Sequence, residues 1–189
     1  MHVVHLMASP FVGGPERQVL GLARAMRPHR STFLSFAERG LARPFLEKAR
    51  ADGFEAIELQ ANFPRIGACI DEVARLLKRL KADALLASCY KPDLIGWRAA
   101  RKAGVPVVAI AHGWTGATLK VRFYEFLDAV AMRFMDAVAC VSESMARRVR
   151  RAGVPGSKVE VIRNALDFAP FESLDAAARP SVLSFFKAP

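Results

Sequence analysis

The sequence is poor in cysteine and has no apolar run long enough to cross a membrane. Its three cysteines, Cys69, Cys89 and Cys140, are widely spaced, with no CxxC pair and no His/Cys cluster. This pattern excludes a disulfide framework and offers no zinc site, so we expect three buried free thiols and no bound metal. The longest apolar runs fall well short of the ~18 residues that a membrane span requires.

Other absences narrow the class of protein further. The first residues have neither the basic start nor the long apolar stretch of a signal peptide, which predicts a cytosolic protein. No polar low-complexity tract occurs, and 52% of the residues are hydrophobic, so a single globular domain is expected. No G-x-G-x-x-G sequence is present, so the chain lacks a dinucleotide-binding fingerprint, and we predict no cofactor.

Acidic residues are outnumbered by basic ones, 18 to 28, which gives a formal net charge of +10. Such a surface favours anionic partners: phosphorylated ligands, acidic lipid headgroups or nucleic acid. The sequence has no helix-turn-helix, RRM or zinc-finger pattern, and its aromatic residues fall at core positions. We therefore predict no nucleic-acid partner.

What the sequence does contain is a regular alternation of short β-branched runs and amphipathic segments. Strands are expected at 2–7, 31–36, 56–59, 84–88, 105–110, 137–141 and 159–163, and helices at 15–26, 41–51, 67–80, 92–103, 118–135 and 142–152. This order predicts an α/β, Rossmann-like parallel sheet with helices on both faces. Right-handed crossovers would bring the carboxyl ends of all strands to one edge.

Candidate functional residues follow one apolar strand directly. His112, Gly113 and Trp114 come just after the strand at 105–110, where ligands bind in open α/β sheets. The imidazole of His112, with an ordinary pKa near ~6.5, is placed either to hydrogen-bond a ligand or to cap local backbone. Trp114 either stacks on a sugar face or packs in the core.

Two further candidate segments, with three residues between them, follow other strands at the same edge. Gly13 and Gly14 precede a helix, so they either let the backbone approach an anion at the helix N-terminus or form an ordinary turn. Lys91 follows the strand at 84–88, where its ammonium could meet a phosphate or a sugar hydroxyl, or simply be solvated.

The last two strands are also followed by polar residues. Ser142 is well suited to be an N-cap, and Glu143 beside it is a candidate ligand contact. Asn164 ends the last strand, where its side chain favours a turn.

In order along the chain, these segments resemble the N-terminal domain of family 4 retaining glycosyltransferases, which have the GT-B architecture. Residues 13–17, Gly-Gly-Pro-Glu-Arg, are similar to the family's GG-x-E-R opening, and His112-Gly113-Trp114 matches a recurring H-G-W. Tyr90-Lys91 with Asp93 and Gly96 is similar to a Y-K-x-D-x-x-G segment of some members. Residues 141–164 match V-S-E-S, G-V-P and K-V-x-V-I-x-N in sequence.

The resemblance implies a nucleotide-sugar-dependent transferase whose residues 1–167 form a Rossmann-like acceptor-binding domain. The residue matching His112 would contact the transferred sugar as the catalytic candidate, the glycine loop would lie against the donor diphosphate, and no metal is expected. Residues that it assigns to the donor or a glycan or lipid-linked acceptor are Gly13, Gly14, Glu16, Lys91, Gly113, Trp114, Ser142, Glu143 and Asn164.

The sequence departs from the family pattern in three places. Ile162-Arg163-Asn164-Ala165 replaces Ile-Pro-Asn-Gly, and Ser88-Cys89 stands where relatives often carry His-Gly. The chain also stops soon after Asp167, whereas relatives continue into a second domain with an acidic E-x7-E pair. Residues 168–189 are expected to be a linker or the start of that domain, so the chain resembles half an enzyme, inactive alone, that needs a C-terminal GT-B domain in cis or in trans.

Two alternatives remain open at this level. The chain could be a non-catalytic partner subunit that docks on a transferase or, through basic residues 147–151 and Lys120 and Arg122, on the anionic inner face of the plasma membrane. It could also be a different GT-B enzyme such as a sugar-nucleotide epimerase, because a shared fold does not fix function.

Overall fold

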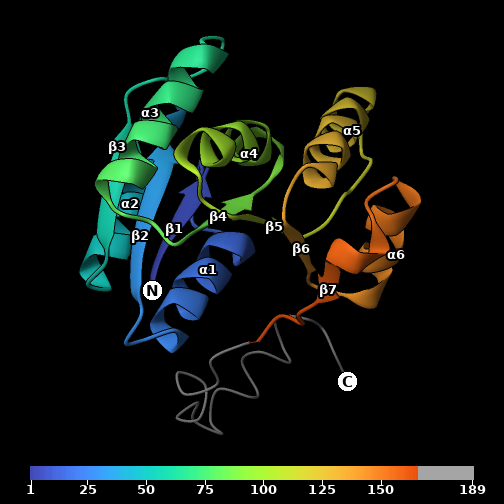
Figure 1. The fold of residues 1–189 in the computed structure, drawn as a ribbon, viewed down its shortest axis with the longest axis horizontal. Helices are drawn as coiled ribbons and strands as arrows, with labels where there is room; N and C mark the ends of the chain where they lie inside the picture. Colours follow the sequence, from blue (N-terminus) through green and yellow to red (C-terminus); the bar gives the residue numbers. More distant parts are fainter. Residues whose placement is uncertain (166–189) are drawn as a thin grey trace, which may run out of the picture.

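The computed structural model describes residues 1–165, in which seven strands form one parallel sheet (Figure 1). The strands are β1 (His2–Met7), β2 (Arg30–Phe36), β3 (Glu55–Leu59), β4 (Ala84–Ser88), β5 (Val107–Ala111), β6 (Ala137–Cys140) and β7 (Val159–Val161). The helices are α1 (Gly14–Ala25), α2 (Arg43–Ala51), α3 (Ile66–Arg79), α4 (Tyr90–Ala103), α5 (Leu119–Arg133) and α6 (Glu143–Arg151). The predicted fold class is confirmed. The predicted linker at 168–189 lies outside the described residues.

The strand order is β3-β2-β1-β4-β5-β6-β7, so the chain winds outward from β1 in one direction and then from β4 in the other. Alternate residues of the central strands serve two separate cores. Leu6 and Leu34 face the core beneath α3, α4, α5 and α6, whereas Met7 and Phe33 face the core beneath α1 and α2. The loops after β1 and β4 therefore leave toward opposite faces. In open α/β sheets a crevice forms at such a switch point.

Local chemistry explains where element ends differ from the expected ones. The helix expected from residue 41 begins at Arg43, because Glu38 and Arg39 have positive φ values of 44° and 59° in a 3-10 turn just before it. β5 begins at Val107 rather than 105, since Pro106 has no N–H to donate to a neighbouring strand. α4 begins two residues early, at Tyr90, with Pro92 accommodated in its first turn.

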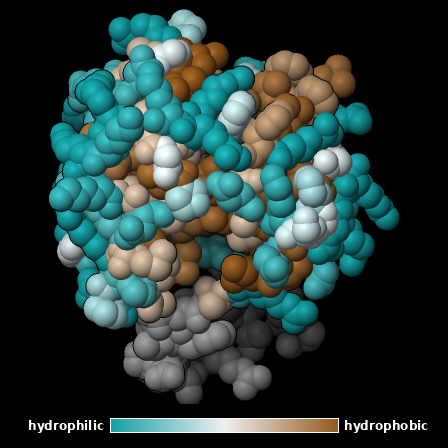
Figure 2. Space-filling model, in the orientation of Figure 1, coloured by the Kyte–Doolittle hydropathy of each residue, from teal (hydrophilic) through white to brown (hydrophobic). Residues whose placement is uncertain are grey.

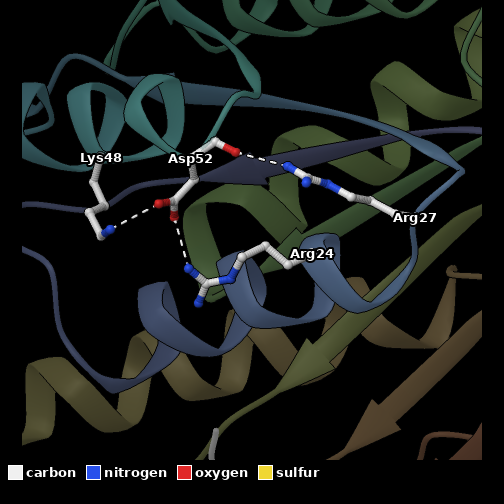
Figure 3. Close-up of polar contacts among 4 residues, drawn as sticks. All are labelled: Arg24, Arg27, Lys48 and Asp52. Carbon is white, nitrogen blue, oxygen red and sulfur yellow. Dashed lines mark hydrogen bonds and ion pairs between the residues drawn. The ribbon is translucent and has the colours of Figure 1, made fainter. Parts of the chain in front are cut away.

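A polar cluster joins the ends of α1 and α2, just before β2 and β3 begin, at the edge of the sheet opposite the loops that follow the strands. Asp52, which ends α2, accepts from Lys48 Nζ at 2.9 Å and from Arg24 Nη1 at 3.2 Å (Figure 3). Its backbone oxygen also accepts from Arg27 Nη2 at 3.0 Å. These contacts join α1 to α2 on the outside of the second core.

Two of the three cysteines follow the expectation. Cys69 and Cys140 are buried free thiols, but Cys89 is exposed, which corrects the prediction for that residue. It lies in the loop between β4 and α4, where φ is 75° and ψ is 160°, a conformation essentially restricted to glycine. None of the helices in residues 1–165 is both long enough and apolar enough to cross a membrane.

Candidate functional site

A cavity of about 340 Å³ opens at the carboxyl ends of β1, β4 and β5. Three segments distant in sequence meet there: Ala8 after β1, Cys89 and Tyr90 after β4, and the stretch from Ile110 to Thr115, which covers the end of β5 and the loop that follows it. Helix α5 closes the remaining side with Val121, Tyr124, Glu125 and Asp128. The size falls in the range of small-molecule sites, about 300–1,000 Å³.

His112 lines this cavity, as its position after an apolar strand predicts. Burial lowers the pKa of its imidazole, and the negative charge of Glu16 opposes that shift only in part. The ring is therefore neutral at pH 7. Its Nε2 atom is buried without a hydrogen-bond partner among the residues that the structure describes. A neutral imidazole nitrogen without a partner can accept or donate one hydrogen bond to a bound hydroxyl.

Trp114 packs against the larger core and also lines the cavity. Its indole Nε1–H donates to Asp128 Oδ2 at 2.9 Å. The guanidinium of Arg148 lies 5.6 Å from the centre of its ring, and Arg148 Nη1 also donates to the Trp114 carbonyl oxygen. The same loop is fixed further along, where Gly116 N donates to Glu125 Oε1 at 2.8 Å. Helices α5 and α6 thus fix the loop that carries His112.

The lining of the cavity suits an uncharged, hydroxyl-bearing ring. Tyr90 and Tyr124 stack with their centroids 4.4 Å apart and present an aromatic wall. Glu125 and Asp128 provide carboxyl oxygens, and no lysine or arginine lines the cavity within residues 1–165. Over the same residues, no group of three His, Cys, Asp or Glu side chains is placed to hold a metal ion.

Gly13 and Gly14 lie at the same edge of the sheet, at the start of α1. The Gly13 N–H donates to Glu16 Oε2 at 2.9 Å, and a Cβ at Gly13 would lie 2.7 Å from the Phe11 ring. Glu16, which is buried, therefore has a capping role that the sequence did not predict. Because its carboxylate takes the Gly13 N–H and Pro15 has none, fewer amides remain for an anion than expected. Contact of these residues with a ligand stays a prediction.

Lys91 is not a solvated side chain, and it does not line the cavity. It is buried, and its ammonium pairs with Glu38 and donates to Asn62 Oδ1 at 2.7 Å. The rings of Phe36 and Phe63 lie 4.4 and 5.1 Å from the same nitrogen. The structure thus places Lys91 at the ends of β2 and β3 and does not bring it together with His112.

The last three predicted residues lie beside α6 and α1. Ser142 is the N-cap of α6, as expected, and its Oγ accepts from Met145 N at 3.1 Å. Glu143 is exposed, and a role in ligand binding stays a prediction. Asn164 is also exposed, and its side chain accepts a hydrogen bond from Gln18 of α1, which brings the chain after β7 next to α1.

Sequence reasoning missed the contribution of α5. Tyr124, Glu125 and Asp128 lie inside a segment expected only to be a long apolar helix. The one available signal was Asp128 itself, a carboxyl group in the otherwise apolar run from Phe126 to Met132. An isolated acidic residue in an apolar helix needs a partner when it is buried.

A parallel sheet with helices on both faces, and a cavity at the carboxyl ends of its strands beside a histidine-glycine loop, defines a Rossmann-like domain. The chain matches glycosyltransferase family 4 over residues 12–169 and belongs to that family. None of the curated protein sequences matches it.

Solved structures show the same fold. A glycosyltransferase from Rickettsia africae is 15% identical with a TM-score of 0.74, and the match covers 100% of this chain and 50% of that one. Anabaena Alr3699/HepE, solved in complex with UDP, is 18% identical with a TM-score of 0.78 over 99% and 50% of the two chains. A UDP-GlcNAc 2-epimerase from Neisseria meningitidis is 17% identical with a TM-score of 0.62 over 99% and 54%. The chain thus spans about half the length of the solved structures that it matches.

Proposed function

We propose that this chain is the N-terminal, acceptor-binding half of a nucleotide-sugar-dependent retaining glycosyltransferase, of the hexosyltransferase kind, acting in polysaccharide or glycolipid biosynthesis. The observation that carries the proposal is the cavity at the ends of β1, β4 and β5, which is lined by His112, a neutral histidine whose buried Nε2 atom has no hydrogen-bond partner within residues 1–165. Family membership and the UDP and UDP-glucose complexes of Anabaena HepE support a nucleotide-sugar donor.

The side chains that line the cavity favour binding of a sugar ring there and of the donor diphosphate elsewhere. A sugar ring would stack against Tyr90 or Trp114 and donate its hydroxyl protons to carboxyl oxygens, while His112 bonds one hydroxyl. A donor diphosphate does not fit a wall bearing Glu125 and Asp128. It would lie toward Gly14 and the start of α1, with most of its contacts supplied by a C-terminal domain in cis or in trans.

The test is binding of UDP-glucose to the 189-residue chain, measured by saturation-transfer NMR. We expect weak, millimolar binding with transfer to the sugar protons, loss of that transfer in His112→Ala, and negligible turnover. His29→Ala is the matched control, because His29 is exposed in the turn before β2. Sugar-proton signals of equal strength in His112→Ala, or rapid transfer by the isolated chain, would contradict the proposal.

A second proposal concerns the cellular location of the enzyme. We propose that it is cytoplasmic and makes peripheral contact with the anionic inner face of the plasma membrane. The start of α5 exposes Leu119, Phe123 and Phe126 by 83%, 57% and 60%, interspersed with exposed Lys120 and Arg122. Figure 2 shows brown and tan residues along the position of α5. Exposed apolar side chains beside cations are typical of helices that lie on anionic lipid.

The basic cluster at 147–151 contributes less to this surface than its sequence indicates. Arg148 is engaged with Trp114, and Arg150 Nη2 donates to the Val159 carbonyl at 3.3 Å.

Flotation with phosphatidylglycerol vesicles tests the membrane contact. Phe123→Ser/Phe126→Ser should lose binding, whereas Leu41→Ser, which removes an exposed apolar residue elsewhere, should not. Equal flotation with neutral phosphatidylcholine vesicles would contradict an electrostatic contact.

A further inference from the structure

Helices α4 and α5 meet in three layers, and the middle layer is a pair of aspartates. Tyr90 stacks on Tyr124 at one end, and Trp97 stacks on Phe134, which ends α5, with centroids 4.9 Å apart at the other. One turn along each helix from the tyrosines lie Asp93 and Asp128. The two aspartates thus lie between two aromatic stacks along the contact of α4 with α5.

Both carboxyl groups are buried, with exposures of 0% for Asp93 and 5% for Asp128. Both oxygens of Asp93 and Oδ1 of Asp128 have no hydrogen-bond donor within residues 1–165. The two groups are close enough to hydrogen-bond to each other once one of them carries a proton. Two buried carboxylates without a cation between them would repel strongly, so one proton between them is required.

The contacts decide which aspartate holds that proton. Burial raises the pKa of Asp128 too, but hydrogen bonds from Asp93 and from the Trp114 indole N–H, which Asp128 Oδ2 accepts, oppose that rise and favour its charged form. Burial and the neighbouring charge of Asp128 raise the pKa of Asp93 well above its usual value. Asp93 is thus the neutral acid, and its O–H is the donor that Asp128 Oδ1 lacks.

We propose that Asp93 is a positioning residue, whose protonated carboxyl donates to Asp128 and thereby fixes Trp114 and the loop carrying His112. The chain of contacts runs from Asp93 to Asp128, from Asp128 to Trp114, and along the loop to His112. Asp93 itself does not line the cavity. Its role deepens the proposed sugar site and rests on it, but the proton and the pose of Trp114 are measurable without any sugar.

Other titratable groups surround the pair and must be separated from it. Glu125 and Tyr124 of α5, and Cys89 and Tyr90 at the start of α4, are close to the pair. Arg148 lies over the ring of Trp114, whose loop also carries His112. On the other side of α4, Glu72 of α3 is engaged with the Gln60 and Ala61 amides. The β1 and β4 side chains that face α4, such as Leu6 and Leu85, are apolar.

The experiment is a pH titration of the Trp114 indole N–H resonance in the ¹⁵N-labelled, unliganded 189-residue chain, which has two tryptophans. Trp97→Phe assigns the signal. We expect one alkaline transition, as Asp93 loses its proton and the two carboxylates repel, with a midpoint well above the ~3.9 usual for aspartate. A ¹³C spectrum of the aspartate carboxyls should show Asp93 protonated at pH 7.

Two substitutions separate positioning from mere packing. Asp93→Asn keeps a donor toward Asp128, so the resonance should stay near its wild-type position and the alkaline transition should vanish. Asp93→Leu removes the donor, so the resonance should be displaced at every pH. Glu125→Gln and Cys89→Ser are controls that should retain the transition.

A third variant covers a failure of Asp93→Asn to fold. Asp128→Asn reverses the donor, so Asp93 should ionise at lower pH and its ¹³C carboxyl shift should move accordingly. A transition that persists unchanged in the Asp93→Asn or Asp128→Asn chain, or an ionised Asp93 in the wild type at pH 7, would overturn the proposal.

Discussion

The indole N–H of Trp114 donates to Asp128 across 2.9 Å, which ties the loop after β5 to the interior of α5. Trp114→Phe would leave that buried carboxylate oxygen without its donor. We expect a loss of about 1–3 kcal/mol in the free energy of unfolding, measured by urea denaturation. Trp97→Phe is the matched control, since phenylalanine can still stack on Phe134, and it should lose less. Equal losses would show that the hydrogen bond contributes nothing beyond the lost ring area.

Cys89 has a backbone conformation that favours glycine, with φ at 75° and ψ at 160°. Such strain costs on the order of 1–3 kcal/mol, and the added freedom of glycine in the unfolded chain offsets about 0.4–1 kcal/mol of the gain. Cys89→Gly should therefore raise the free energy of unfolding by about 1 kcal/mol. Cys89→Ala removes the thiol but keeps the strain, so it should give no such gain. A stabilised alanine variant would refute the backbone explanation.

The Lys91–Glu38 pair should be energetically coupled more strongly than an exposed pair. The Lys91 side chain is 7% exposed, so removing Glu38 leaves an ammonium largely cut off from water. A double-mutant cycle with Lys91→Met and Glu38→Gln should give a coupling energy of about 1–3 kcal/mol. The Lys102–Asp71 pair, with both side chains more than half exposed, should give under about 1 kcal/mol. Similar coupling in both cycles would contradict the role of burial.

His5 makes the fold sensitive to acid. Burial lowers the pKa of its imidazole to about 3, and its ring stacks on Phe33 with centroids 4.6 Å apart. In the unfolded chain the pKa returns to ~6.5, so the unfolded state binds more protons between those values and stability falls as the pH drops through that window. Between pH 7 and pH 5 we expect His5 to account for a loss of about 1–2 kcal/mol.

His5→Phe should reduce this pH dependence, because phenylalanine keeps the stacked ring and cannot take up a proton. Urea denaturation at the two pH values measures the difference. His29→Gln, at an exposed position, should leave the pH dependence unchanged. The same slope in wild type and His5→Phe would place the titrating group elsewhere, with His112 the next to test.

The parts of the fold that follow from local pattern were predictable. β1 and β4 have the predicted bounds, because short, mostly apolar runs that are closed by polar or turn residues leave little choice of where a strand begins and ends. His112 and Trp114 were found for the same reason, since the carboxyl edge of a parallel sheet is fixed by topology. The contacts that a side chain makes with residues distant in sequence were harder to predict.

Lys91 illustrates that limit. Its position after β4 was correctly placed at the edge, but its burial depends on Phe36, Glu38 and Asn62, which come from the ends of two other strands. Asp93 and Asp128 illustrate it again, because only the packing of α4 on α5 brings the two carboxyls together. The resemblance to a Y-K-x-D-x-x-G segment marked these positions without their roles. The structure supplies the roles: Tyr90 stacks, Lys91 pairs, Asp93 meets Asp128, and Gly96 lets α4 approach β4, where an added Cβ would lie 3.3 Å from Ala87.

The outward winding of the sheet from β1 and β4 bears on how such a protein can diversify. The two loops at the switch point leave toward opposite faces, and each is followed by a helix that packs on its own core. A change in the length or the residues of either loop alters the lining of the cavity, while the packing of the helices and strands beneath the loop stays intact. Each loop can therefore change in sequence separately, because the residues at this edge of the sheet and the residues that pack the two cores lie in separate stretches of the chain.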